Sequence, residues 1–206
     1  MTQIIAIDGP AGSGKSTVAR AVSTALGWSF LDTGAMYRAV TAEVLRRGID
    51  PADAEAVAQV AAGASISTLP RVTINGVDVE ETIRSEPVNI AVSTIAANPA
   101  VRRAMVTRQR AWAAAQPTGT VVEGRDIATV VFPDARLKVY LTASLDERAR
   151  RRGDEGVSSV TRRDSADRER VASPLRQASD AVVIDTTDLS IDQVVEEIVR
   201  WLKTPN

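Results

Sequence analysis

The sequence feature that most constrains this chain is Gly9-Pro10-Ala11-Gly12-Ser13-Gly14-Lys15-Ser16-Thr17, which fits the P-loop pattern G-x-x-x-x-G-K-[ST]. The apolar run 3–8 before it predicts a buried parallel strand, and residues 14–26 after it predict a helix that stops at Gly27. A glycine-rich turn at that junction lets backbone N–H groups surround phosphate at the positive end of the helix dipole. We therefore expect residues 9–17 to bind a nucleoside triphosphate, with Lys15 reaching the phosphates and the Ser16 hydroxyl binding Mg²⁺.

Strand and helix patterns alternate along the rest of the chain. Short apolar runs at 28–32, 120–123, 137–141 and 181–185 follow helical stretches. This alternation predicts an α/β protein with the three-layer P-loop fold, in which helices flank a five-stranded parallel sheet. The alternating residues around Asn75-Gly76 instead predict a tight hairpin, which does not belong to a strand–helix–strand unit. We expect a single kinase-sized domain with a core of 1–62, 96–147 and 177–206, a small insert at about 63–95, and an Arg-rich lid at 148–176.

Composition excludes several kinds of chemistry. Cysteine and histidine are both absent, which removes thiolate chemistry, cysteine metal sites and the usual general base. The net charge is −1 and aromatic residues make up only 3%, so we expect no nucleic-acid partner. The N-terminus has no signal-peptide pattern and no apolar window reaches about 18 residues. We therefore expect a cytoplasmic protein that does not interact with membranes, and as a separate expectation a monomer.

Arginines are concentrated between residues 145 and 176. The helical pairs Asp146–Arg150 and Glu147–Arg151 explain part of this density. The remainder favours a lid that brings arginines over phosphates. The nine arginines are Arg148, Arg150, Arg151, Arg152, Arg162, Arg163, Arg168, Arg170 and Arg176.

Charged residues also follow the predicted strands, at the edge where ligands bind in open α/β sheets. Glu123 ends the strand 120–123 and is well placed to hold Mg²⁺, usually through water. Asp32 and Asp126 are the carboxylates available as a base. The arginines expected to converge as clamps on an anionic acceptor are Arg38, Arg125, Arg163 and Arg170.

A P-loop by itself does not separate hydrolases, kinases and switches. The small size of the chain and its two arginine groups favour phosphoryl transfer to a small molecule, and an ionised phosphate acceptor agrees with the missing histidine. The alternatives are a kinase for another small acceptor, such as AMP, UMP or shikimate, and a nucleotide-binding switch without turnover.

A long helix is expected to begin at Asn98-Pro99. Several arginines on this helix predict a solvated face: Arg102, Arg103, Arg108 and Arg110.

Three segments carry a resemblance to a known family: residues 7–17, the D-T-G-A-M-Y-R segment within 31–38, and the E-G-R-D segment within 123–135. The match continues through 162–164, 167–175 and 185–191, so it covers essentially the whole chain. The sequence resembles the bacterial cytidylate kinases of the nucleoside monophosphate kinase group. This resemblance implies transfer of the ATP γ-phosphoryl group to CMP or dCMP, with Mg²⁺ as cofactor.

The resemblance also implies roles for individual residues. Arg38, Arg125 and Arg170 would hold the CMP phosphate, with Thr33 nearby. Ser93, Arg102 and Asp126 would read the cytosine, and Arg163 and Asp167 would meet the sugar. The expected catalytic residues are Lys15, Arg125, Asp126 and Arg163; the metal ligands are Ser16 and Glu123; the ATP-binding residues are 9–17; and the CMP-binding residues are Asp32, Thr33, Arg38, Ser93, Arg102, Arg125, Asp126, Arg163, Asp167 and Arg170.

Overall fold

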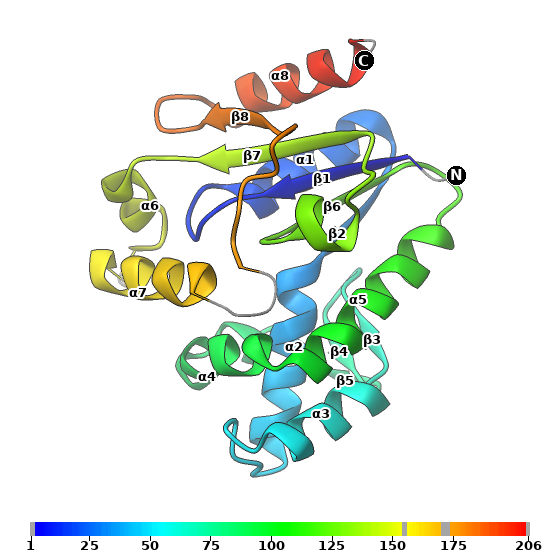
Figure 1. Cartoon of the computed structure of the whole chain (residues 1–206), viewed down its shortest axis with the longest axis vertical. Coiled ribbons are helices and arrows are strands. Elements are labelled where there is room, and N and C mark those ends of the chain that lie inside the picture. The colour runs from blue at the N-terminus through cyan, green and yellow to red at the C-terminus, as the bar shows by residue number, and fades with distance from the viewer. Residues whose placement is uncertain (1–2, 154–155, 170–173, 205–206) are drawn as a thin grey trace. The chain divides into compact units, whose positions relative to one another are not determined.

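The computed structural model describes residues 3–153, 156–169 and 174–204. The chain forms two compact units, coloured along the sequence in Figure 1. Unit 1 comprises Met1–Leu31 and Trp112–Asn206, and unit 2 comprises Asp32–Ala111. The predicted insert at about 63–95 lies within unit 2, and unit 2 extends beyond it at both ends. The boundaries predicted for core, insert and lid stay predictions.

Unit 1 is built on the predicted five-stranded sheet, which the structure confirms. Its strands lie in the order β2-β6-β1-β7-β8, with the P-loop strand β1 in the centre. Every residue of β1 is buried, and β1 pairs in parallel with β6 and β7. The register sets Asp8 beside Gly124 on one side and Tyr140 on the other. The strands are β1 (Ile4–Asp8), β2 (Ser29–Asp32), β6 (Thr120–Gly124), β7 (Leu137–Thr142) and β8 (Val182–Asp185).

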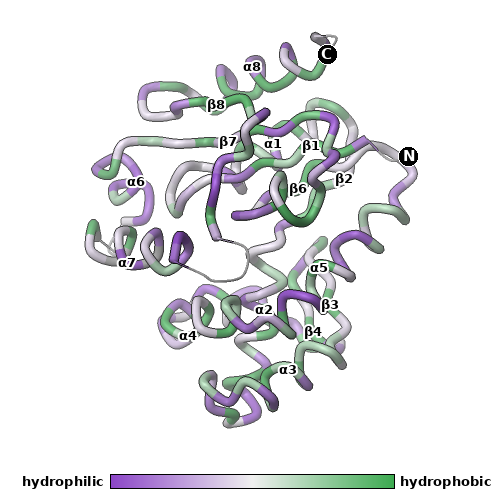
Figure 2. The backbone as a smooth tube through the Cα atoms, viewed as in Figure 1, coloured by the Kyte–Doolittle hydropathy of each residue, from purple (hydrophilic) through white to green (hydrophobic). Residues whose placement is uncertain are grey.

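Helices α1 (Lys15–Leu26) and α8 (Ile191–Lys203) share one hydrophobic core with the sheet. Figure 2 shows hydrophilic and hydrophobic residues alternating along α8, as an amphipathic helix requires. The helix begins with a capping box, in which Ser190 and Gln193 exchange side-chain-to-backbone hydrogen bonds. The residues of this core are Ile5, Ile7, Val18, Ala19, Val22, Phe30, Val121, Leu137, Val139, Leu141, Ile184, Val194, Ile198 and Leu202.

The arginine-rich segment of unit 1 forms two helices, α6 (Leu145–Arg151) and α7 (Gly156–Arg168). The predicted Glu147–Arg151 pair is present at 2.7 Å, but Arg150 also pairs with Glu147 at 2.7 Å rather than with Asp146. One carboxylate therefore serves two guanidinium groups, since residues three and four positions further along lie on the same helix face. A one-turn π-helix, η2 (Ile127–Val131), follows β6 and was not predicted.

Unit 2 contains α2 (Thr33–Arg46), α3 (Ala54–Gly63) and a small three-stranded sheet. The predicted hairpin is confirmed: β4 (Thr73–Ile74) and β5 (Val77–Asp78) are antiparallel across Asn75-Gly76. Both turn residues have positive φ, 52° and 80°, which is the conformation that makes Asn-Gly favourable in such turns. The third strand, β3 (Ile66–Ser67), pairs with β4.

Two elements complete unit 2: η1 (Thr82–Arg84) and α4 (Glu86–Ala97). The sequence interpretation missed α4, although its start carries a recognisable signal. Ser85 stands at the N-cap, Pro87 lies in the first turn, and Val88, Ala91 and Ile95 are buried at helical spacing. The next helix, α5 (Pro99–Ala114), begins in unit 2 after Asn98, whose side-chain oxygen accepts from the Ala100 N–H at 2.9 Å.

Candidate functional site

The P-loop of unit 1 folds tightly against neighbouring backbone. Gly12 has φ +78°, and a Cβ added there would come within 2.6 Å of the Arg148 carbonyl oxygen. A side chain at this position would therefore meet both backbone strain and a steric clash. The loop can pass this close to α6 only because residue 12 is a glycine.

Lys15 is buried at the start of α1. Its amine donates to the Pro10 carbonyl at 2.7 Å and lies 3.5 Å from the Ser13 hydroxyl, both within the loop. Burial, and after it the nearby Arg125 guanidinium, lower the pKa of this amine to about 7, while Glu123 acts in the opposite direction. A polyanion in the loop would favour the charged form, because it would supply the compensation that burial removes.

Ser16 and Glu123, the two predicted metal ligands, lie together. The Ser16 hydroxyl donates to the Glu123 carboxylate at 2.7 Å, although the two residues are 107 positions apart. Both offer hard oxygen donors beside the phosphate loop. Among the described residues no group of three or more carboxylates could by itself hold a metal ion.

Asp8 organises the segment that follows β6, a role that the sequence interpretation did not foresee. Its carboxylate accepts from the backbone N–H groups of Ile127 at 2.9 Å and Ala128 at 2.7 Å. Burial raises the pKa of the Asp8 carboxyl to about 6, against the lowering effect of these two N–H groups. The result is a fixed backbone position for Arg125 and Asp126, which immediately precede the π-helix.

The predicted acceptor residues in unit 1 are only partly described. Arg125 and Asp167 pair directly, with the Arg125 Nε donating to the Asp167 carboxylate at 2.7 Å. Asp126 is buried and precedes η2. Arg163 lies on α7, but the structure describes only its backbone. Arg170 lies outside the described residues.

In unit 2, Arg38 is held from two sides. Its Nη1 donates to the Ile83 carbonyl and to the Asn89 side-chain oxygen, each at 2.7 Å. Thr33 is buried at the start of α2, and Asp32 caps that helix by accepting from the Ala35 N–H at 2.8 Å. Asn89, on the helix that the sequence interpretation missed, thus belongs to the surroundings of a predicted site residue.

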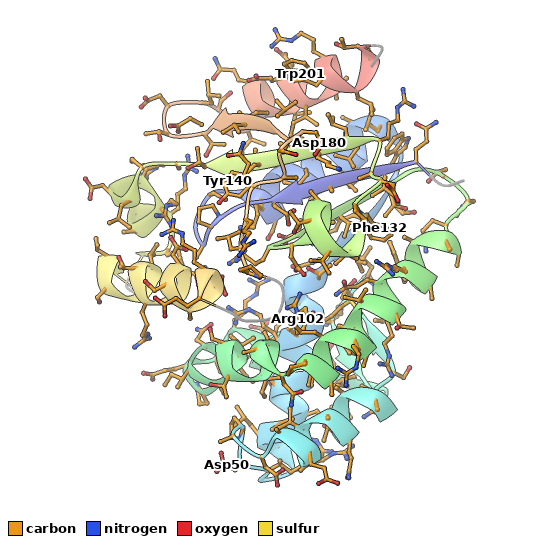
Figure 3. All side chains as sticks on the ribbon, viewed as in Figure 1. Asp50, Arg102, Phe132, Tyr140, Asp180 and Trp201 are labelled. Atoms are coloured by element: carbon orange, nitrogen blue, oxygen red, sulfur yellow. The ribbon has the colours of Figure 1, made fainter. Side chains whose placement is uncertain are left out.

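Arg102 and Ser93 also belong to unit 2. Arg102 lies on α5 (Figure 3) and is only 4% exposed, which corrects the prediction that it shares a solvated face with Arg103, Arg108 and Arg110. The guanidinium carbon of Arg102 lies 5.5 Å from the centre of the Tyr37 ring, and the Arg102 Nη1 donates to the Ala96 carbonyl at 3.3 Å. Ser93 is half-buried on α4. A buried, stacked guanidinium has a fixed orientation, as a group that reads a ligand requires.

The parallel sheet with a G-x-x-x-x-G-K-[ST] loop after its central strand defines a P-loop nucleotide-binding protein. The family model for cytidylate kinase matches residues 5–204. The chain therefore belongs to the cytidylate kinase family, and it is a nucleoside monophosphate kinase by that membership.

Curated relatives match over nearly the whole chain. A cytidylate kinase from Mycolicibacterium paratuberculosis is 48% identical over 95% of this chain and 92% of its own length. One from Geobacillus kaustophilus is 46% identical over 95% and 94%. Among solved structures, a shikimate kinase from Acinetobacter baumannii in complex with shikimate has a TM-score of 0.51 at 13% identity, covering 98% of this chain and 93% of that one. At that identity the structural match supports the fold alone.

Within the part of the chain that the structure describes, no helix has the length and apolar character needed to span a membrane.

Proposed function

We propose that this chain transfers the γ-phosphoryl group of ATP to CMP and dCMP, forming ADP with CDP or dCDP. The observation that carries the proposal is the cytidylate kinase match over residues 5–204. It is supported by the Ser16–Glu123 contact beside the P-loop, at the place where the family's phosphoryl donor would need its metal ion.

In the proposed reaction an oxygen of the CMP phosphate attacks the γ-phosphorus of ATP, and the bond from that phosphorus to the β-γ bridging oxygen breaks. The loop N–H groups and Lys15 hold the phosphates of ATP. Arg38, Arg125 and Arg170, with Arg163, neutralise the acceptor phosphate, so that two anions approach each other. Such a reaction depends on positioning and charge neutralisation, and it needs no histidine base.

Ser16 and Glu123 are the residues that we propose to hold Mg²⁺, directly or through water. Their hard oxygen atoms suit this ion, which keeps several waters and shares its coordination with substrate phosphates. Bound there, Mg²⁺ would supply positive charge beside the triphosphate. Removal of divalent ions with a chelator should abolish turnover, and adding back Mg²⁺ should restore it.

Base selection is assigned to Ser93, Arg102 and Asp126, and sugar binding to Arg163 and Asp167. The exocyclic amine of cytosine is a donor that suits a carboxylate, whereas N3 and O2 are acceptors that suit arginine and serine. Asp32 and Thr33 complete the proposed acceptor site.

We further propose that the enzyme works as a monomer in the cytoplasm. Sedimentation at a mass above that of one chain would contradict the monomer.

The test is a coupled assay with ATP, Mg²⁺ and each of CMP, dCMP, UMP and AMP. We expect CMP and dCMP to give the highest kcat/KM, with CDP or dCDP identified by chromatography. A strong preference for AMP, or ATP binding without any cytidine diphosphate, would overturn the proposal.

A further inference from the structure

Helices α6 and α7 contribute a buried ion pair to the P-loop that neither the proposed nucleotide contacts nor the metal site uses. Arg148 of α6 and Asp164 of α7 pair directly, with side chains only 9% and 4% exposed. A buried pair of this kind is retained only where further hydrogen bonds satisfy both groups.

Two further hydrogen bonds of this pair go to a single residue of the P-loop, Ala11. The Asp164 carboxylate accepts from the Ala11 N–H at 3.1 Å, and the Arg148 Nη1 donates to the Ala11 carbonyl at 3.1 Å. The Arg148 Nε also donates to the Ala143 carbonyl at 3.1 Å, which ties the pair to the end of β7. Donor and acceptor of one loop residue are therefore both fixed by the same ion pair.

The helix that carries Asp164 also carries Asp167, three residues further on. Asp167 accepts from the Arg125 Nε at 2.7 Å. Residues at this spacing lie on one face of a helix. That face of α7 thus contacts the P-loop at Ala11 and the segment after β6 at Arg125, which are the donor side and the acceptor side of the proposed reaction.

We propose that Arg148 and Asp164 are positioning residues for phosphoryl transfer: by clamping Ala11, they fix the P-loop relative to α7 and hence to Arg125. This inference rests on the proposed function. Neither side chain needs to touch a nucleotide. A displacement of the loop by about 1 Å would be enough to lower transfer on the order of a hundredfold, because the reacting atoms must be aligned.

The test compares Asp164→Asn with Asp180→Asn, which alters the exposed Lys138–Asp180 pair of the same unit. The amide of Asn keeps one acceptor for two donors and turns an NH₂ group toward Arg148 or Ala11. CDP formation and inorganic phosphate release from ATP are measured in the same reaction. We expect Asp164→Asn to lower kcat for CDP at least about tenfold and to raise the ratio of phosphate to CDP, since a misaligned γ-phosphoryl group is open to water. Asp180→Asn should leave both unchanged.

The ratio separates positioning from loss of folded protein, which would lower CDP and phosphate together. Two further variants should raise the same ratio. Arg148→Lys keeps the charge but loses the planar guanidinium group, which donates several hydrogen bonds. The double variant Arg148→Met with Asp164→Asn leaves no unpaired buried charge. An unchanged ratio in these folded variants would overturn the clamp. A wild-type protein that makes no CDP would instead overturn the proposed function.

Discussion

Lys15 in the P-loop and Asp8 just before it are buried ionisable residues, and each has backbone hydrogen-bond partners. The Lys15 amine donates to the Pro10 carbonyl, and the Asp8 carboxylate accepts from Ile127 and Ala128. Both pKa values are displaced toward neutrality, to about 7 and about 6, chiefly by burial. Displaced values of this kind are common where a protein prepares charge for a ligand.

Lys15→Met should lower kcat at least about a hundredfold, since removing one stabiliser of developing charge costs about 3 kcal/mol. Methionine has a similar length and suits a buried position, so packing is largely kept. Steady-state turnover of ATP with CMP is the measurement. Unchanged turnover would remove Lys15 from the catalytic residues.

Asp126→Ala should reduce kcat/KM for CMP about tenfold to a hundredfold, because the cytosine amine would lose a buried acceptor. We expect a smaller loss with UMP, whose base has a carbonyl in place of that amine, and little change in the KM for ATP. The comparison uses both acceptors under identical conditions. Equal losses with CMP and UMP would show that Asp126 does not read the base.

At the scale of elements, short-range patterns predicted most of unit 1. The strands 3–8, 28–32, 120–123, 137–141 and 181–185 all appear within one or two residues of their predicted limits. The capping box at Ser190 and the Asn75-Gly76 hairpin also appear, because both depend on residues a few positions apart. The π-helix after Asp126 could not be predicted in this way, since its N–H groups bond to Asp8 about 120 positions earlier.

The P-loop offers a prediction at this scale. Gly12→Ala would introduce a Cβ 2.6 Å from the Arg148 carbonyl at φ +78°, so it should destabilise the fold by about 1–3 kcal/mol and weaken ATP binding. Gly63→Ala is the matched control, because it lies at the end of α3 with no atom near the added Cβ. The control should be neutral or stabilising by up to about 1 kcal/mol. Urea unfolding and ATP titration of both variants test this, and equal behaviour would contradict it.

For the whole molecule, the buried Lys15 amine links stability to pH. Its pKa is about 7 when folded and has its ordinary value of 10.5 when unfolded. Between these values the unfolded chain binds more protons, so the Lys15 contribution to the free energy of unfolding rises with pH. Below about pH 7 the Lys15 amine is charged in the folded, nucleotide-free protein as well, and its burial then lowers the free energy of unfolding by the full amount.

Lys15→Met should therefore raise the free energy of unfolding of the nucleotide-free protein at about pH 7, and this gain should shrink as the pH rises toward about 10. Urea unfolding at several pH values measures it. Lys138→Met serves as the matched control, since it removes the lysine that pairs with exposed Asp180. A gain that does not change with pH would contradict the assignment of a buried, titrating amine.

The sequence by itself determined the P-loop, the order of strands and helices, and the family to which the chain belongs. Glycine spacing, hydrophobic periodicity and helix caps all act over a few residues, and so they can be read directly from the chain. It also predicted Ser16 and Glu123 as one group, because the P-loop follows one strand and Glu123 ends another, and parallel strands end at one edge of the sheet.

Only the tertiary structure decided which buried charges meet. Ala11 and Asp164 are 153 positions apart, and Arg125 and Asp167 are 42 apart. Arg102 belongs to a helix face that its sequence pattern predicts to be solvated, yet it is buried against Tyr37. These contacts depend on the order and register of the strands and on how each helix packs, and no local pattern specifies them. The cause is physical: local hydrogen bonding selects the elements, whereas burial of the whole core selects their neighbours.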